Sequence, residues 1–143
     1  MNKQKVLFLC TGNSARSQMA EAILRKHAGD KFDVFSAGLE PKGINPFTVL
    51  VMKEAGYDLT SQYSKQLNVY YAKYQFDYLI TVCSDAEKNC PFFPGVSVRL
   101  HWPFDDPAAV KGDDEAVLSK FREIRDQIEQ KIDSWLSSLD TAG

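Results

Sequence analysis

Short runs of hydrophobic residues along the chain alternate with longer segments in which hydrophobic residues recur at helical spacing. The first run, Lys5–Leu9, contains four consecutive apolar residues and is typical of a buried strand. Similar runs at Phe32–Phe35, Asp77–Val82 and Val96–Leu100 predict three more strands. The chain therefore has four candidate strands, distributed from its beginning to about residue 100.

Helical patterns separate these strands. A helix is predicted over residues 17–27, and Gly29 ends it. A second helix begins at Asn45, an N-cap residue, with Pro46 in its first turn, and it ends at Gly56. Each of these helices lies between two predicted strands, as in a β–α–β unit.

Two further helices are expected in the second half of the chain. Ser64–Tyr74 is predicted to contain a short one, and Asp114–Leu139 a long amphipathic one. The apolar positions of the long helix are Val117, Phe121, Ile124, Ile128, Ile132, Trp135 and Leu136. The alternating order predicts an α/β fold: one catalytic domain over residues 1–143, with a four-stranded parallel sheet between two helical layers.

The composition is that of an ordinary soluble protein. The 143 residues are 44% hydrophobic and 25% charged, and the net charge of −2 favours neither nucleic acid nor a membrane surface as a partner. No apolar run approaches the roughly 20 residues that a membrane span needs. Because we find no signal-peptide pattern, we expect a cytoplasmic protein. We also expect a monomer. In the cytoplasm the three cysteines are more often reactive than structural.

A polar loop connects the first strand to the first helix. Cys10 opens this loop and Arg16 closes it, at a point where backbone N–H groups and the helix dipole favour an anion. This environment predicts a Cys10 pKa well below that of a free thiol, which gives a nucleophilic thiolate. The planar guanidinium of Arg16 suits a tetrahedral oxyanion. The residues expected to bind the oxyanion are Thr11, Gly12, Asn13, Ser14, Ala15, Arg16 and Ser17.

Within this loop, we expect Ser17 to donate a hydrogen bond to the Cys10 sulfur and Asn13 to brace the loop from inside. The alternative is that Gly12, Asn13 and Ser14 merely form a turn. That alternative does not explain why a cysteine and an arginine flank the turn directly after a buried strand. The segment lacks the Gly-Lys-Ser/Thr ending of a nucleotide-binding phosphate loop.

Two other candidate segments also follow predicted strands. Ligands of parallel sheets bind at the carboxyl ends of the strands, where Cys10, Cys83 and the loop that begins at His101 are all expected. In that loop Asp106 precedes a proline, which makes the backbone rigid, and a carboxylic acid there can protonate a departing oxygen. The alternative is a solvated turn, and the role of His101 stays open.

Cys83 and Cys90 lie seven positions apart and share one face if the segment is helical. Seven residues of helix separate their Cα atoms by roughly 10 Å. A disulfide needs Cα atoms within about 7 Å. Either the two thiols never pair, or pairing unwinds the helix. The alternative to a redox role is that both cysteines are simply small buried apolar residues. The spacing does not suit zinc, and we expect no metal.

Together these motifs resemble a known family. The sequence from Cys10 to Glu21, with Ser36-Ala37-Gly38, is similar to the low-molecular-weight tyrosine phosphatase superfamily. Cys83, Cys90 and the segment from His101 to Pro107 narrow the resemblance to the thioredoxin-coupled arsenate reductases. The similarity runs from Val6 into the C-terminal helix and implies a flavodoxin-like fold of the low-molecular-weight phosphatase type.

The resemblance implies a relay of three cysteines that needs no cofactor. Cys10 attacks arsenate held by the loop and Arg16, while the acid before proline, Asp106 rather than Asp105, protonates the leaving oxygen. Cys83 then attacks Cys10 and expels arsenite. Cys90 finally attacks Cys83, which leaves a disulfide that thioredoxin reduces. Glutaredoxin and mycothiol are the alternative reductants.

One residue departs from the family pattern. Members that bind potassium near Asn13 and Glu21 have an aspartate directly after the serine that corresponds to Ser64, whereas this chain has Lys65. A lysine ammonium repels a cation and can itself occupy the site. We therefore expect no dependence on potassium.

Three other functions compete with arsenate reduction. A tyrosine phosphatase needs only Cys10, Arg16 and Asp106, but aromatic residues are expected after its Asp-Pro, where this chain has Ala108-Ala109. Weak phosphatase activity is still expected, because phosphate esters share the tetrahedral anionic shape. A non-catalytic oxyanion sensor predicts binding without turnover. A general disulfide oxidoreductase is disfavoured, because Cys-x-x-Cys is absent.

Overall fold

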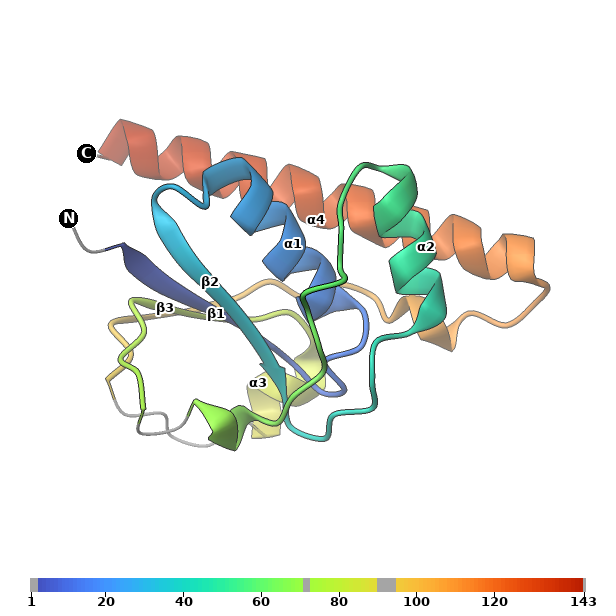
Figure 1. Cartoon of the computed structure of the whole chain (residues 1–143), viewed down its shortest axis with the longest axis horizontal. Helices are drawn as coiled ribbons and strands as arrows, with labels where there is room; N and C mark the ends of the chain where they lie inside the picture. Colours follow the sequence, from blue (N-terminus) through green and yellow to red (C-terminus); the bar gives the residue numbers. More distant parts are fainter. Residues whose placement is uncertain (1–2, 71–72, 90–94, 143) are drawn as a thin grey trace.

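The computed structural model of the chain describes residues 3–70, 73–89 and 95–142 and contains one parallel sheet. Its strands are β1 (Gln4–Cys10), β2 (Phe32–Gly38), β3 (Tyr78–Thr81) and β4 (Val98–His101), in the spatial order β2-β1-β3-β4 (Figure 1). All three neighbouring pairs are parallel. The carboxyl ends of the strands therefore meet at one edge of the sheet.

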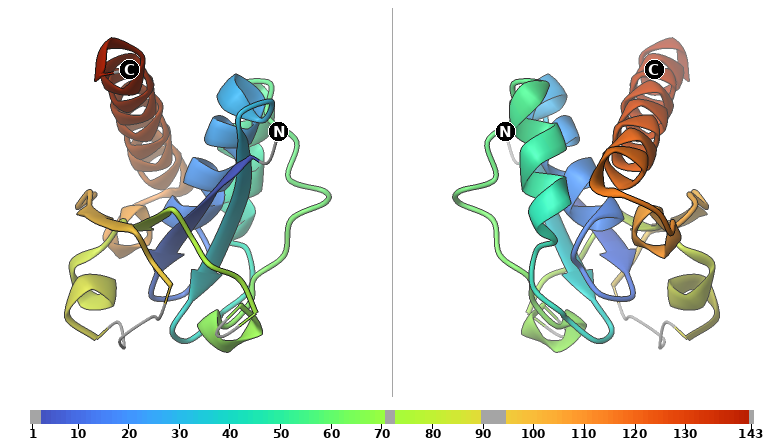
Figure 2. Two further views of the ribbon diagram at one scale, coloured as in Figure 1. Left: turned by 90° about the vertical axis from the view of Figure 1, so that its left-hand side faces the viewer. Right: turned by 90° about the vertical axis from the view of Figure 1, so that its right-hand side faces the viewer.

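Helices lie on both sides of this sheet. The α-helices are α1 (Arg16–Ala28), α2 (Pro46–Glu54), α3 (Ser84–Asn89) and α4 (Asp114–Ala142), and two short 3-10 helices are η1 (Leu67–Val69) and η2 (Pro107–Ala109). Helices α1, α2 and α4 lie above the sheet as drawn, whereas α3 and η1 lie below it (Figure 2). The predicted fold class is thus confirmed.

The hydrophobic core is centred on β1 and the two helices that cover it. The four residues 6–9 of β1 are fully buried, as a continuous apolar run predicts. Of the two helices that cover β1, α1 contributes residues such as Ile23, and α4 contributes the fully buried Phe121, Ile124, Ile128 and Ile132. This packing fixes the end of β1, from which the candidate loop departs.

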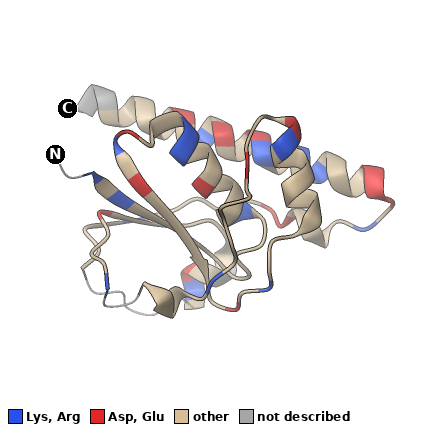
Figure 3. Ribbon diagram, viewed as in Figure 1, with Lys and Arg blue, Asp and Glu red and all other residues tan. Residues whose placement is uncertain are grey.

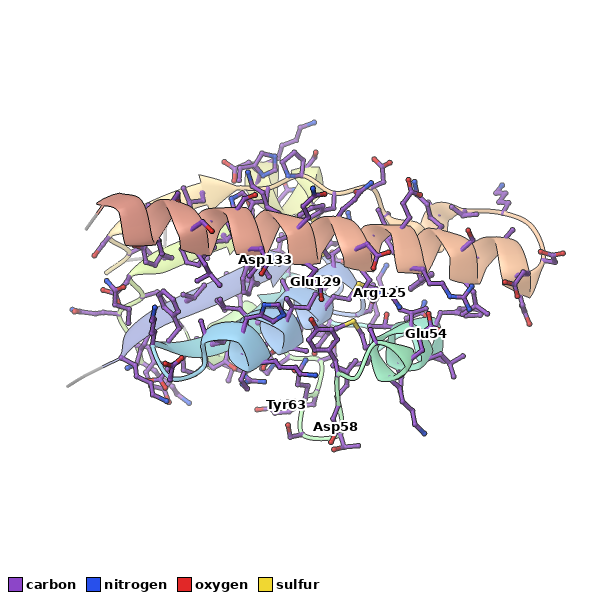
Figure 4. The ribbon with its side chains drawn as sticks, turned by 90° about the horizontal axis from the view of Figure 1, so that it is seen from above. Glu54, Asp58, Tyr63, Arg125, Glu129 and Asp133 are labelled. Atoms are coloured by element: carbon purple, nitrogen blue, oxygen red, sulfur yellow. The ribbon has the colours of Figure 1, made fainter. Side chains whose placement is uncertain are left out.

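Acidic and basic residues are interspersed along α4 (Figure 3). Arg125 on α4 reaches α2, donating to the carbonyl of Val51 at 2.8 Å and to the carboxylate of Glu54 at 2.9 Å (Figure 4). Further along α4, the Asp133 carboxylate lies 3.1 Å from His27 Nδ1 of α1. Among the described residues, no helix is long and apolar enough to cross a membrane.

Three expected elements differ in extent. Strand β2 continues to Gly38 because it pairs with β1 along its full length, down to Cys10. Strand β4 is shifted to Val98–His101. The helix expected within Ser64–Tyr74 is reduced to η1, since Tyr70 and Tyr74 pack their rings on Phe35 of β2 instead of following a helical repeat.

Candidate active site

Strand β1 delivers Cys10 into the loop that precedes α1. Cys10 is buried at the end of the strand, and Arg16 is the first residue of the helix. Between them Asn13 adopts a left-handed backbone (φ 48°), a conformation that asparagine tolerates better than most residues. The loop passes so close to Gly38 that a Cβ there would lie 2.7 Å from the Thr11 carbonyl oxygen. The glycine after Ser36-Ala37 thus makes room for the loop.

Buried hydrogen bonds hold the loop from behind. The Asn13 amide donates to the hydroxyls of Ser17 (2.8 Å) and Ser36 (3.0 Å), while its oxygen accepts from the Lys65 backbone N–H (3.0 Å). Asn13 and Ser17 are both fully buried. Asn13 therefore braces the loop as expected. The hydrogen bond found at Ser17 is the one that its hydroxyl accepts from Asn13, whereas we expected it to donate to the Cys10 sulfur.

The loop surrounds a cavity of about 450 Å³. Residues from three segments line it: Cys10, Thr11, Gly12, Ser14, Ala15, Arg16, Lys42, Gly43, Ile44, Asn45, Pro46, Asp106 and Ala108. The thiol, the guanidinium and the carboxylate that the sequence singled out thus share one cavity. Asn13 and Ser17 support its wall from inside the protein.

Arg16 is anchored, but it keeps a donor free. One terminal nitrogen donates to the carbonyl of Phe104 at 3.0 Å, and the other lies 3.9 Å from the carboxylate of Asp106. In the described part of the chain, Arg16 Nε is buried without a hydrogen-bond partner. A buried donor without a partner costs free energy, about 1–3 kcal/mol. An oxyanion in the cavity would supply the missing acceptor.

The two neighbouring aspartates differ in their surroundings. Asp106 lines the cavity and accepts a hydrogen bond from the backbone N–H of Ala108 at 2.9 Å, which fixes its carboxylate at the start of η2. Asp105 instead lies 3.4 Å from the ammonium of Lys120 on α4 and has an 81% exposed side chain. Of the pair, Asp106 is therefore the acid that can reach a substrate.

Cys83 comes close to the loop because β3 is the neighbour of β1. The strand register pairs Leu9 with Thr81, so the chain after β3 emerges beside Cys10. The Thr11 hydroxyl lies 3.3 Å from the Cys83 sulfur. Cys90, the third predicted participant, lies outside the described residues.

The protonation of the two buried thiols differs from the expectation. A hydrogen bond with Cys83, together with burial, raises the pKa of Cys10 far above that of a free thiol. The pKa of Cys83 is lowered to about 5, because its sulfur accepts hydrogen bonds from Cys10, Thr11 and the Ala86 backbone N–H. The raised pKa of Cys10 differs from the low value that we expected for this thiol, and the lowered pKa is that of Cys83.

The residues near Asn13 and Glu21 do not fit a potassium ion. The Lys65 ammonium is buried there and donates to the carbonyls of Ser36 (2.9 Å) and Tyr63 (2.8 Å). It also lies 4.0 Å from the Glu21 carboxylate. Desolvation lowers the Lys65 pKa, and the charge of Glu21 opposes that shift. An ammonium group therefore takes the carbonyl and carboxylate oxygens that a cation would use.

Sequence reasoning missed two features of the site. Lys42 lines the cavity because its backbone N–H donates to the Gly12 carbonyl at 3.0 Å, which ties the segment before α2 to the loop. The carbonyl of Phe104 orients Arg16. Neither follows from residue spacing, since both depend on tertiary contacts.

Comparisons with known proteins agree with this geometry. The low molecular weight phosphotyrosine protein phosphatase family matches residues 5–142. An arsenate reductase of Halalkalibacterium halodurans is 46% identical over 132 residues, covering 92% of this chain and 94% of its own. A solved arsenate reductase in the phosphate-binding state has a TM-score of 0.79 at 29% identity, covering 94% of this chain and 98% of its own.

A second solved structure is a thioredoxin-dependent arsenate reductase of Corynebacterium glutamicum. Its TM-score is 0.71 at 30% identity, and the match covers 99% of this chain and 64% of the other. The similarity to these proteins thus includes the whole sheet and all four α-helices.

Proposed function

The chain belongs to the low molecular weight phosphotyrosine protein phosphatase family, and on that premise we propose that it reduces arsenate to arsenite. The observation that carries this proposal is a second buried cysteine, Cys83, whose sulfur lies 3.3 Å from the hydroxyl of Thr11 in the oxyanion loop. A phosphatase needs one nucleophile and has no use for a thiolate behind it. A relative named arsenate reductase, 46% identical over most of the chain, supports the same activity.

The first step forms a bond between Cys10 and arsenic. Arsenate binds to the loop amides and to Arg16, whose free Nε gains an acceptor. Cys10 passes its proton along the hydrogen bond to Cys83 and attacks arsenic. Asp106, in its protonated form, gives its proton to a hydroxyl group of arsenate, which leaves as water.

The second step transfers electrons. Cys83, whose extra proton moves to an oxygen of the arsenic group, attacks the Cys10 sulfur. The sulfur–arsenic bond breaks, and its electron pair stays on arsenic, so that As(V) becomes As(III). The products are arsenite and a Cys10–Cys83 disulfide.

The third step restores Cys10. The Cys90 thiolate attacks Cys83 and releases Cys10 as a thiolate, which leaves a Cys83–Cys90 disulfide. A dithiol protein of the thioredoxin class then supplies two electrons and two protons. The thioredoxin-dependent relative from Corynebacterium glutamicum supports this choice of reductant.

The test compares two substrates and two aspartates. With thioredoxin, thioredoxin reductase and NADPH, the protein is expected to release arsenite from arsenate, and to hydrolyse p-nitrophenyl phosphate only weakly. Asp106→Asn is expected to slow arsenite release about 100-fold, because the leaving oxygen loses its proton donor. Asp105→Asn is the matched control, since Asp105 contacts Lys120 instead of the cavity.

Three outcomes would count against the proposal. Rapid hydrolysis of p-nitrophenyl phosphate without arsenite release would identify a phosphatase. If Asp106→Asn and Asp105→Asn slow arsenite release equally, Asp106 is not the proton donor of the mechanism. Tight arsenate binding without any turnover would instead indicate an oxyanion sensor.

A further inference from the structure

The short helix α3, which begins directly after Cys83, is tied to the sheet through Glu87. The Thr81 hydroxyl at the end of β3 donates to the Glu87 carboxylate at 2.6 Å. His101 Nδ1 lies 2.9 Å from the same hydroxyl. A hydroxyl has one hydrogen, and here Glu87 receives it, so the His101 ring donates its N–H to Thr81. A chain of hydrogen bonds thus runs from β4 through β3 to α3.

Arg99 adds a second tie from β4. One terminal nitrogen donates to the backbone carbonyl of Glu87 at 3.2 Å and lies 3.4 Å from its carboxylate. A carbonyl in the last turn of a helix lacks an intrahelical partner, and Arg99 supplies one. The hydrogen bond from Thr81, with the positive charge of Arg99, lowers the pKa of Glu87, so its carboxylate is charged.

These contacts matter because α3 is too short to be stable by itself. It has six residues, whereas isolated helices shorter than about 12 residues are marginal in water. Its own hydrogen bonds include that of the Glu87 N–H to the Cys83 carbonyl, at 3.2 Å. The helical state of α3 therefore depends on its tertiary contacts. We call Glu87 with Thr81, Arg99 and His101 the Glu87 anchor.

We propose that Glu87 is a positioning residue of the redox step, which holds α3 helical through the Glu87 anchor while Cys83 is reduced. The inference rests on the three-cysteine relay proposed above. A helix from Cys83 to Cys90 would separate their Cα atoms by roughly 10 Å, so a disulfide between them requires α3 to unwind. Unwinding must break the Glu87 anchor.

A contact that exists only in the dithiol form stabilises that form. Reduction of the Cys83–Cys90 disulfide takes two electrons and two protons from an external dithiol, and the Glu87 carboxylate gains no proton in the process. The Glu87 anchor then re-forms and favours the reduced state. It thereby makes the disulfide easier for the reductant to cleave, and it returns Cys83 to its place beside Thr11.

The test is a redox titration of the full-length chain in glutathione buffers, with Cys10→Ser in the background so that Cys83 and Cys90 alone can pair. Alkylation and mass spectrometry measure the oxidised fraction. Glu87→Gln is expected to favour the disulfide about tenfold, which is a midpoint potential about 30 mV more negative. Arg99→Gln is expected to shift the midpoint in the same direction. Lys88→Gln, an exposed position on the same helix, is the matched control and should not shift it.

Hydrogen exchange supplies a readout that needs no disulfide. In the reduced protein, the amides of residues 84–89 are expected to exchange faster in Glu87→Gln than in Lys88→Gln. If the Cys83–Cys90 disulfide forms, but its midpoint potential and the amide exchange rates of residues 84–89 are the same in both variants, the role of the Glu87 anchor is overturned. The three-cysteine relay is then unaffected. No Cys83–Cys90 disulfide in any variant would overturn the relay, and this inference with it.

Discussion

Two buried sulfur atoms at the end of β1 and β3 share one negative charge. The pKa of Cys83 is the lowered one, because its sulfur accepts hydrogen bonds from Cys10, Thr11 and the Ala86 N–H. The hydrogen bond with Cys83 and burial raise the pKa of Cys10. In the mechanism proposed above, Cys83 is therefore the attacking group of the second step, and Cys10 becomes nucleophilic by giving Cys83 its proton.

This assignment predicts the titration of the reduced protein. In a Cys90→Ser chain, thiolate absorbance at 240 nm should rise with a midpoint near pH 5, the pKa of Cys83. Because the pKa is lowered, the thiolate is present above that pH and is lost as the pH falls through it. Thr11→Val removes one hydrogen bond and should raise the midpoint, whereas Ser14→Ala, at another loop position, should not. A first midpoint near 8.5, the ordinary value for a thiol, would contradict the shared charge.

At the scale of elements, α4 holds α2 in place beside the cavity. Arg125 connects the two helices through the Val51 carbonyl and Glu54, and only 14% of its side chain is exposed. Arg122 also pairs with Glu54, but it is more exposed and lacks the backbone contact. The position of Asn45 and Pro46 in the cavity wall therefore depends on Arg125 more than on Arg122.

Urea unfolding can compare these two arginines. Arg125→Gln should lower the free energy of unfolding by about 1–2 kcal/mol, since it leaves the Val51 carbonyl without its charged donor. Arg122→Gln should lower the free energy of unfolding by less, because exposed ion pairs contribute little to stability. If the two variants lose the same free energy of unfolding, the contact of Arg125 with the Val51 carbonyl adds no stability beyond that of an exposed ion pair.

In the segment between α2 and η1, the ammonium group of Lys65 takes the place of a bound cation. Lys65 bonds to the carbonyls of Ser36 and Tyr63, beside Glu21, and so ties this segment to β2 and α1. Arsenate turnover should therefore be the same in potassium and sodium salts of equal ionic strength. Lys65→Asp should make turnover respond to potassium, because it replaces the ammonium with a carboxylate. Wild-type activity that rises steeply with potassium over sodium would contradict this account.

The elements that sequence reasoning predicted well are those whose burial is regular. The consecutive apolar residues of β1 and the repeat along α4 required no knowledge of their neighbours. Tyr70 and Tyr74 have no such repeat, because they pack on Phe35, and the helix expected there was reduced to η1. The oxyanion loop was predictable because its residues are consecutive. The charge on Cys83 was not, since it depends on which strand lies beside β1.

For the molecule as a whole, the strand order decides the chemistry. The order β2-β1-β3-β4 places Cys10 beside the residue that follows β3, and the chain after β4 brings Asp106 to the same cavity. Parallel strands direct all their carboxyl ends to one edge, so three segments distant in sequence converge there. In the proposed function the loop alone captures an oxyanion, and the cysteine after β3 makes the capture a reduction.

Single-turnover chemistry of the cysteine variants tests this central claim most directly. The reduced proteins are mixed with arsenate in the absence of thioredoxin, and arsenite and disulfides are counted. Cys90→Ser should release one arsenite per chain and accumulate the Cys10–Cys83 disulfide, because the first two steps need no third thiol. Cys83→Ser should release none. Arsenite released by Cys83→Ser in the same amount as by Cys90→Ser would contradict the account.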